Sequence, residues 1–600
     1  MRHAIGRFLA WVGGLFLLVL FVAIAIAAFS SREKAVPART ILEVNLEVEL
    51  QEDSQQNPLA KLRPDGAGSL RSLLVGLERA AEDPRVVGLL ARLGQTKMGM
   101  AQVQELRDAI RRFRDKGKFA LAYSETFGEF GQGNSSYYLA TAFEQIWLQP
   151  SGDVGLTGVL MEPFFIKNAL EKLGLKPQMD QRYEYKNAMN MFTENKFTPA
   201  HKEALEKIAQ GWYAQMVRGI AEGRKLQDGE VKALVDRGPC LGPEALKEKL
   251  VDQLGYRDEF MAKGRERGGS DAQLLFLHKY VERTDKAEKQ RLKQAPTLAL
   301  IYGLGGVQRG KGEVDPLSGS SALGSDTVTA AFRSAVADKD VKAIVFRIDS
   351  PGGSYVASDA VWREVVRARA AGKPVIATMG NVAGSGGYFV AMAADKIVAQ
   401  PATITGSIGV LGGKFITSEL LNNKLGVTQD RVAFGQHAGM WSTNREFTPD
   451  EWVRFQAWLD RVYVDFTNKV AEGRKLPKDA VLKVAKGRIW TGEDGKGIGL
   501  VDELGGLDVA VRLARQASGI ADGQPVALKQ FPAQKPPIAM LRDAVLGKDS
   551  DNSESPASTQ VAVRVRPATL LRAALQAIFD DEIAGEASGA LRMHDLPSTH

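Results

Sequence analysis

The sequence predicts an α/β protein in which two tandem repeats follow one N-terminal transmembrane helix. Three observations support this prediction. An uncharged apolar segment lies near the N-terminus, apolar strand-like runs alternate with amphipathic helical windows, and short motifs recur about 250 residues apart. A chain of 600 residues is long enough for such an arrangement, because a typical domain has about 100–200 residues.

The first element is the apolar segment from Phe8 to Phe29, FLAWVGGLFLLVLFVAIAIAAF. At about 1.5 Å per residue, a helix of this length spans the roughly 30 Å hydrocarbon core of a bilayer. A cleaved signal peptide usually has a shorter apolar region of about 7–15 residues. We therefore expect residues 8–29 to be a retained signal-anchor. Basic residues flank both ends, so charge does not fix its orientation, but such an anchor in a bacterial-looking chain most often exports the rest of the chain.

The two repeats are identified by four pairs of matching segments in the same order. AEGRKL at 221–226 recurs at 471–476, and LVDQLG at 250–255 is answered by LVDELG at 500–505. Upstream, DPRVVGLLARL at 83–93 matches the pattern of DKDVKAIVFRI at 338–348, and EQIWLQP at 144–150 matches DKIVAQP at 395–401. One such match could arise by chance, whereas four at nearly one offset indicate a duplication.

These matches divide the chain into an N-terminal repeat at 38–280 and a C-terminal repeat at 297–532. The charged stretch near 280–296 is expected to be a linker between them. In the C-terminal repeat, strands are expected at 298–304, 343–349 and 374–380, with helices at 326–336 and 357–370 between them. The tail at 533–600, rich in Pro and Ser at its start, is expected to be largely disordered apart from one short helix in ATLLRAALQAIFDDEI.

The composition excludes several classes of function. The net charge of +7 is small for this length, and no Lys/Arg tract with interleaved aromatic residues suggests nucleic-acid binding. A single cysteine rules out an intrachain disulfide and a cysteine-based metal cluster. The sequence has no HExxH motif and no clustered acidic ligands, so we expect neither a metal nor another cofactor.

Two glycine-containing turns in the C-terminal repeat carry the candidate chemistry. DSPGGS at 349–354 and AGSGGYF at 383–389 each follow a predicted strand and open a predicted helix. Ser385 lies in the second turn as a candidate nucleophile, and the amides of the first could bind an oxyanion. Because the two strands would be neighbours, the turns are expected to converge.

A serine nucleophile needs a base, and two residues are candidates. His437, 52 residues after Ser385, has no obvious acid partner beside it. In the N-terminal repeat, Asn134 aligns with Ser385, although Ser135 and Ser136 are adjacent to that register, and LGQTKMG at 93–99 replaces the glycine turn. That repeat instead contains Lys186 in RYEYKNAMNMF, and a buried lysine of lowered pKa can act as a general base. The serine and the lysine thus occur in opposite copies.

With SPGGS, AGSGGYF, TGSIGV and YEYKNA in matching order, the chain resembles the signal peptide peptidase A (protease IV) family in its long form, from the anchor to about residue 530. The resemblance implies a repeated fold like those of Clp protease and crotonases, with Ser385 as nucleophile and Lys186 as base. It further implies that Ser407 orients the lysine and that the amides of Gly353 and Gly386 form the oxyanion hole.

The same resemblance implies a setting and a substrate class. It implies a homotetrameric bowl on the periplasmic face of the bacterial inner membrane, with sites at subunit or repeat junctions. The substrates would be remnant signal peptides and other unfolded apolar peptides. AGSGG stands where many relatives have AASGG, which should not affect the chemistry, while a Ser–His pair with His437 stays possible at this stage.

Two other functions remain open from sequence. A catalytically inactive membrane scaffold could bind peptides with the same fold. A crotonase-like acyl-CoA enzyme could use a glycine-turn oxyanion hole for a thioester enolate, although it would need carboxylates at the site and would gain nothing from a membrane anchor.

Overall fold

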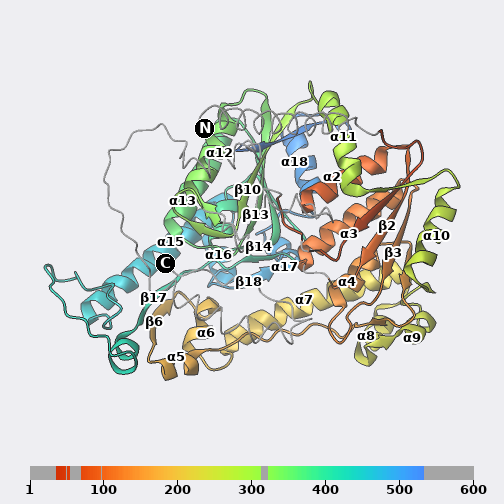
Figure 1. Ribbon diagram of the computed structural model, residues 1–600. Helices are drawn as coiled ribbons and strands as arrows, with labels where there is room; N and C mark the ends of the chain where they lie inside the picture. Colours follow the sequence, from red (N-terminus) through yellow and green to blue (C-terminus); the bar gives the residue numbers. More distant parts are fainter. Residues whose placement is uncertain (1–34, 49, 54–68, 96–97, 313–321, 533–600) are drawn as a thin grey trace, which may run out of the picture.

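The computed structural model describes residues 35–48, 50–53, 69–95, 98–312 and 322–532, and these form two α/β units that pack side by side (Figure 1). The predicted anchor at 8–29 and the tail at 533–600 lie outside the described residues. Within the described ranges, no helix is both long and apolar enough to cross a membrane.

The N-terminal unit is built on a parallel six-stranded sheet of order β8-β4-β3-β2-β1-β9. Its strands are β1 (Thr40–Asn45), β2 (Val86–Leu93), β3 (Phe119–Ser124), β4 (Gln145–Leu148), β8 (Gln253–Leu254) and β9 (Gln273–Phe276). Strands of this kind, apolar on both sides, form the core of an α/β unit and need helices on both faces. The helices of this unit are α2 (Leu70–Glu82), α3 (Met100–Asp115), α4 (Asn134–Ala140), α8 (Asp228–Arg237), α9 (Gly242–Lys247) and α10 (Arg257–Gly268). A separate, short antiparallel pair is formed by β5 (Asp153–Val154) and β7 (Cys240–Leu241).

The C-terminal unit repeats this order with additional strands. Its sheet runs β18-β16-β14-β13-β10-β20, and β15 pairs with β14 and β19. The strands are β10 (Thr297–Leu304), β13 (Val341–Ser350), β14 (Val375–Gly384), β15 (Lys396–Ala399), β16 (Ile404–Gly406), β18 (Ile489–Thr491), β19 (Glu503–Leu504) and β20 (Ala527–Phe531), with a separate pair β11 (Gly306–Gln308) and β12 (Ala322–Gly324). Its helices are α12 (Ser325–Ala337), α13 (Tyr355–Ala370), α14 (Gly386–Ala391), α16 (Lys478–Val484), α17 (Gly492–Gly497) and α18 (Leu507–Ala517).

The repeat is visible in individual residues as well as in strand order. The long helices α7 (Pro199–Arg224) and α15 (Pro449–Arg474) each have 26 residues, a threonine N-cap and a left-handed lysine at the C-terminal end. The Tyr137 hydroxyl donates to the Leu250 carbonyl at 2.7 Å, and Tyr388 donates to Leu500 at 3.0 Å. The predicted α/β fold with two tandem repeats is therefore confirmed.

Between the repeats, the stretch expected to be a linker is mostly helical. α11 (Leu277–Arg291) buries Leu277 and Tyr280, and the Tyr280 hydroxyl donates to Asp83 at 3.0 Å. The stretch lies between the two units as expected, and its charges lie on the exposed face of a helix whose other face packs on α2. Only a few residues then lead into β10.

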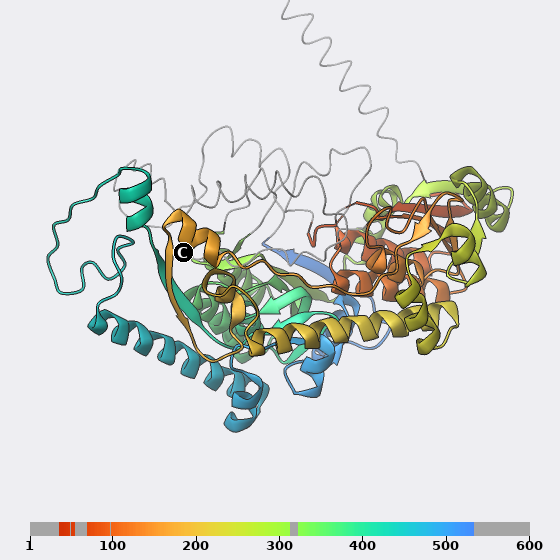
Figure 2. The ribbon, with the colours of Figure 1, turned by 90° about the horizontal axis from the view of Figure 1, so that it is seen from below.

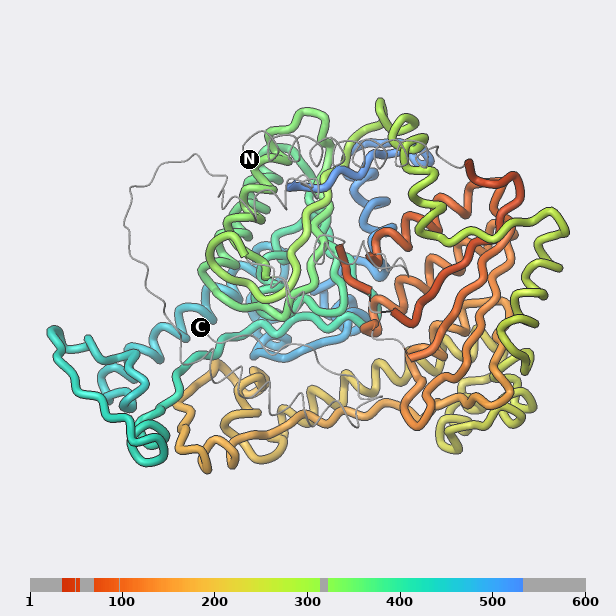
Figure 3. The backbone as a smooth tube through the Cα atoms, viewed as in Figure 1, coloured from red at the N-terminus to blue at the C-terminus, as the bar shows by residue number. Residues whose placement is uncertain are grey.

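One excursion from the N-terminal repeat lies against the C-terminal repeat. It contains α5 (Lys167–Leu173), β6 (Lys176–Gln181) and α6 (Asn190–Thr193), and β6 pairs antiparallel with β17 (Leu411–Ile416). Figures 2 and 3 show β6 and β17 side by side, far from the N-terminal sheet. This pairing positions the segment that follows β6 next to the C-terminal sheet.

Candidate active site

Ser385 lies at the sharp turn between β14 and α14, as the sequence predicted. Its backbone has φ 52° and ψ −117°, a region that residues other than glycine rarely adopt and that costs about 1–3 kcal/mol. The Ser385 amide donates to the Gly406 carbonyl at 2.9 Å, and α14 behind it is buried along its whole length. The turn is therefore held by its surroundings while the hydroxyl projects from the end of the strand.

The first glycine turn lies directly beside Ser385, because β13 and β14 are paired neighbours. Gly352 has φ 106°, and a methyl group added to it would lie 2.7 Å from the Ser385 Cβ and 2.6 Å from the Gly386 nitrogen. A methyl group on Gly386 would lie 3.1 Å from the Gly353 nitrogen. The amides of Gly353 and Gly386 are thus close together next to the Ser385 side chain, and only glycines allow this approach.

Lys186 comes to the same place from the other repeat, in the segment after β6. Its Nζ lies 2.9 Å from the Ser385 Oγ, 2.9 Å from the Ser407 Oγ and 2.8 Å from the Ser407 carbonyl oxygen. The side chain is 5% exposed, and this burial lowers the pKa of the Lys186 amine to about 7 because the charged form loses its hydration. Two residues 199 positions apart therefore share a hydrogen bond within one chain.

Ser407 contacts the same amine as Ser385. It also has a positive φ of 52°, and its amide donates to the Arg488 carbonyl at 2.7 Å. Both of its oxygens face the Lys186 amine. The residue predicted to orient the lysine thus lies in hydrogen-bonding contact with it.

Two glycines make room for Lys186, and sequence reasoning missed both. A methyl group on Gly487, which has φ 82°, would lie 2.5 Å from both the backbone nitrogen and the Cβ of Lys186. A methyl group on Gly409 would lie 3.2 Å from the Lys186 Cδ. The repeat alignment contained a signal for Gly487. At the local offset of 250 residues Gly487 aligns with Arg237 (487 − 237), so the C-terminal repeat has a glycine at a position where the N-terminal repeat has none.

Where the C-terminal repeat has Ser385, the N-terminal repeat has Asn134, whose side-chain amide is used in local hydrogen bonds. The shared tyrosine contacts confirm that Asn134 aligns with Ser385. The Asn134 side chain accepts from the amides of Thr157 and Gly158 and donates to the Gly158 carbonyl at 2.7 Å. It therefore ties its own loop together. Of the two adjacent serines, Ser136 donates to the Gly133 carbonyl at 3.0 Å and serves the local turn.

His437, the other candidate base, has an acid partner that is distant from it in the sequence. Its Nε2 lies 3.2 Å from an Asp450 carboxylate oxygen, a partner that the residues beside it in the sequence do not reveal. Asp450 lies at the start of α15, 13 residues after His437 (450 − 437), and the loop between them brings the two together. The Ser385 hydroxyl is instead bonded to Lys186.

Comparison with known proteins gives the family. The sequence pattern of peptidase family S49 matches twice, at residues 112–269 and 367–521, once in each repeat. The chain is 31% identical to the chloroplastic serine protease SPPA of Arabidopsis thaliana, over 82% of this chain and 72% of that one. It is also 31% identical to protease 4 of Salmonella typhi, over 80% and 76% of the two chains, and 28% identical to protease 4 of Haemophilus influenzae, over 84% and 83%.

These relatives are all named as proteases, which favours a serine endopeptidase over an inactive scaffold or an acyl-CoA enzyme. The two family matches cover one segment of each α/β unit, and the second contains the Ser385 turn. The chain therefore belongs to peptidase family S49 and is a serine endopeptidase built from two S49 repeats.

Proposed function

We propose that this endopeptidase works with a Ser385–Lys186 dyad formed across the two repeats. The observation that carries the proposal is the 2.9 Å contact between the Lys186 amine and the Ser385 hydroxyl. Burial supports it further, because an amine with a pKa of about 7 is neutral in a large fraction of molecules at neutral pH.

Three oxygens surround the amine, and its neutral form can bond to all three. A neutral amine has two N–H bonds and one lone pair. Its N–H groups donate to the Ser407 carbonyl and Oγ, and its lone pair then accepts the Ser385 O–H. Ser407 thereby aims the lone pair at the proton that must be removed.

In acylation, the Ser385 proton moves to the Lys186 Nζ as Oγ bonds to the substrate carbonyl carbon. The ammonium then returns that proton to the leaving amine nitrogen as the C–N bond breaks, which leaves an ester on Ser385. In deacylation, a water gives a proton to the same amine, its oxygen attacks the ester carbon, and the Oγ leaves with the proton from Lys186. The amine begins and ends each cycle neutral.

The amides of Gly353 and Gly386 are proposed to bind the oxyanion of each tetrahedral intermediate. They lie together beside Ser385, and the first N–H groups of a helix such as α14 have no acceptor within the helix. One such donor is typically worth about 2.7–4 kcal/mol of the activation barrier. No metal or other cofactor is part of this mechanism.

Peptides are the substrates of a peptidase, and we propose remnant signal peptides and other unfolded apolar peptides as their class. A relative from Enterococcus faecium is named a putative signal peptide peptidase, 33% identical over 32% of this chain. The apolar segment 8–29 supports a single-pass anchor in the bacterial inner membrane, with the catalytic body in the periplasm. Assembly as a homo-oligomer, a tetramer by family resemblance, is part of the same proposal.

Alanine variants test the dyad. Ser385→Ala and Lys186→Ala are expected to lower kcat for an apolar peptide by at least about 100- to 10,000-fold, and Ser407→Ala by less. His437→Ala is the matched control and should leave activity near the native value. The dyad is wrong if Lys186→Ala stays near native activity or if His437→Ala abolishes it.

A further inference from the structure

A bulge in β14 lies between the regular pairing of β13 with β14 and the Ser385 turn. The two strands pair in register as far as Ile348↔Met379, and the next pair is Ser350↔Ala383. β13 therefore advances two residues where β14 advances four (350 − 348 and 383 − 379), so β14 has two extra residues here. A bulge changes the direction of the residues that follow it, and on β14 these lead directly to Ser385.

The Asp349 side chain bonds to the bulge from the β13 side. Its carboxylate accepts the Val382 amide at 2.9 Å and also accepts the amide of Asn381. The Asp349 carbonyl oxygen accepts the Gly305 amide at 2.9 Å, so its backbone is fixed by the turn after β10. One carboxylate thus satisfies two strand amides, and an amide left without an acceptor in such a place would cost about 1–3 kcal/mol.

The bulge fits closely around this carboxylate. A methyl group added to Gly380 would lie 2.9 Å from both the Cγ and the Oδ2 of Asp349, so a side chain at that position would displace the carboxylate. On the other side of the bulge, the Thr403 hydroxyl donates to the Gly380 carbonyl at 2.8 Å, and Val382 pairs with Ile404 of β16. The shape of the bulge therefore depends on β16 at one side and on Asp349 at the other.

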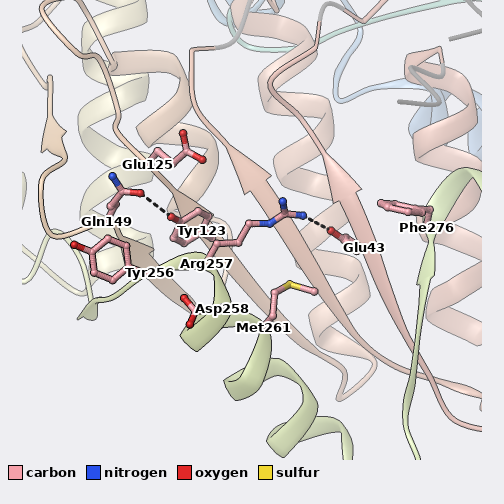
Figure 4. Close-up of a pocket in the computed structure, with 9 residues that line it drawn as sticks. All are labelled: Glu43, Tyr123, Glu125, Gln149, Tyr256, Arg257, Asp258, Met261 and Phe276. Carbon is pink, nitrogen blue, oxygen red and sulfur yellow. Dashed lines mark hydrogen bonds and ion pairs between the residues drawn. The ribbon is translucent and has the colours of Figure 1, made fainter. Parts of the chain in front are cut away.

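The N-terminal repeat has no carboxylate at the position of Asp349. The pairings of β2 with β3 and of β13 with β14 set a local offset of 255 residues, at which Gly94 takes the place of Asp349 and Glu125 that of Gly380. There β3 ends at Ser124, and Glu125 lines an open pocket of about 580 Å³ (Figure 4). Like the serine and the glycine turn, this carboxylate thus occurs only in the copy with the nucleophile.

The charged groups near Asp349 determine when its carboxylate is ionised. Desolvation raises the pKa of Asp349 to about 7, the Glu52 carboxylate adds to the rise, and Arg347 opposes it. Arg347 also bonds Glu52 at 2.9 Å and Glu105 at 2.8 Å, and β14 has no titratable side chain. At pH 8.5 the carboxylate is therefore ionised and can accept both amides.

We propose that Asp349 is a positioning residue that holds the Ser385 turn in register with the glycine turn at the end of β13. The inference rests on the proposed oxyanion hole, whose two amides, of Gly353 and Gly386, come from the two turns. A shift of one turn against the other separates these donors from the oxygen that they stabilise. Asp349 acts through the backbone of β14 and exchanges no proton with the substrate.

Substitution of Asp349 tests this role at pH 8.5 in the full-length chain. Asp349→Leu removes both acceptor oxygens and is expected to lower kcat for an apolar peptide at least about tenfold, with KM changed by less than about threefold. Asp349→Asn should lower kcat by less, because its carbonyl oxygen still accepts an amide. A peptide aldehyde adds to the Ser385 hydroxyl as a hemiacetal, and its inhibition constant should rise with the fall in kcat. A smaller folded fraction would lower kcat alone.

Asp395→Asn is the matched control. The Asp395 carboxylate also accepts a strand amide, that of Val375 at 2.8 Å, but at the other end of β14. This variant should keep kcat and the aldehyde inhibition constant near their native values. Gly380→Ala is a second test that keeps the Asp349 carboxylate and displaces it from the bulge. It should lower kcat and raise the aldehyde inhibition constant in the same direction as Asp349→Leu.

The inference is overturned if Asp349→Leu keeps the native inhibition constant, or if Asp349→Asn is no more active than Asp349→Leu. If Asp349→Leu does not fold, an unchanged inhibition constant in Gly380→Ala overturns it instead. Lys186→Ala separates this result from the dyad. When Lys186→Ala is inactive, a native-like Asp349→Leu refutes only the role of Asp349, whereas an active Lys186→Ala refutes the dyad itself.

Discussion

At the scale of single residues, the proposed dyad requires one lysine to be neutral. Lys186 is buried among oxygen atoms that are uncharged, and its lowered pKa comes from desolvation alone. The protein therefore holds an amine where its charged form is unfavourable, and below about pH 7 this lowers the stability of the folded chain by about 5 kcal/mol. Function and stability oppose each other at this residue.

This opposition predicts the behaviour of Lys186→Met. The amine has a pKa of about 7 in the folded state and an ordinary value of 10.5 when unfolded, so between these values only the unfolded state binds the proton. The native chain consequently gains stability as pH rises above about 7, and the methionine variant does not. We expect the stability of the variant relative to native to fall by about 2–3 kcal/mol between pH 6 and pH 9, measured by denaturant unfolding. If the stability of the variant relative to native stayed constant between pH 6 and pH 9, or rose, the pKa of Lys186 would not be lowered.

At the scale of elements, the pairing of β6 with β17 and the turn at Gly487 place the lysine. β6 leaves its own repeat to pair with a strand more than two hundred residues later, and the chain then turns into Lys186 against Gly487. The strand pair sets the direction of approach, while the glycine sets how closely the lysine backbone can lie.

Gly487→Ala is therefore expected to displace Lys186 and to lower kcat at least tenfold with KM little changed, because a methyl group would overlap the lysine backbone. Gly519→Ala is the matched control, since Gly519 also has a positive φ, 70°, but has open space around it. Both variants carry similar backbone strain. Equal activities of the two would show that Gly487 does not position the lysine.

The regular helices and strands were easier to predict from the sequence than the placement of Lys186 beside Ser385. The strands expected at 298–304 and 343–349 and the helices expected at 326–336 and 357–370 are present as β10, β13, α12 and α13, because their apolar periodicity is strong. The pairing of β6 with β17 was not foreseen, since both strands are short, half-buried and far apart in sequence. Lys186 could be named because the serine and the lysine occur in opposite copies and because YEYKNA resembles a motif of the family.

At the scale of the whole molecule, a buried ion cluster joins the two repeats. Arg347 of β13 bonds Glu52 at 2.9 Å and Glu105 of α3 at 2.8 Å, and all three side chains are less than 10% exposed. Removing one partner from such a buried cluster leaves a charge incompletely compensated. The cluster therefore couples the folding of the two units on which the site depends.

Glu105→Ala is expected to destabilise the chain by about 3–5 kcal/mol in denaturant unfolding and to lower activity in proportion to the folded fraction. Arg218→Ala is the control, because Arg218 also pairs across the repeats, with Glu493 at 2.8 Å, but is 52% exposed and should cost less than about 1 kcal/mol. A small, equal effect of both variants would mean that the buried cluster does not hold the repeats together.

The central claim is that an amine from one repeat serves the serine of the other, and the pH dependence of kcat/KM tests it most directly. The measurement compares the native enzyme with Lys186→Cys before and after alkylation by 2-bromoethylamine, which rebuilds the side chain with a sulfur and a less basic amine. Cys240, the only native cysteine, is buried. We predict a native profile that falls below about pH 7, loss of activity in the cysteine variant, and recovery on alkylation with the fall moved to lower pH. Native activity in the unalkylated variant, or recovery with an unmoved profile, would contradict the claim.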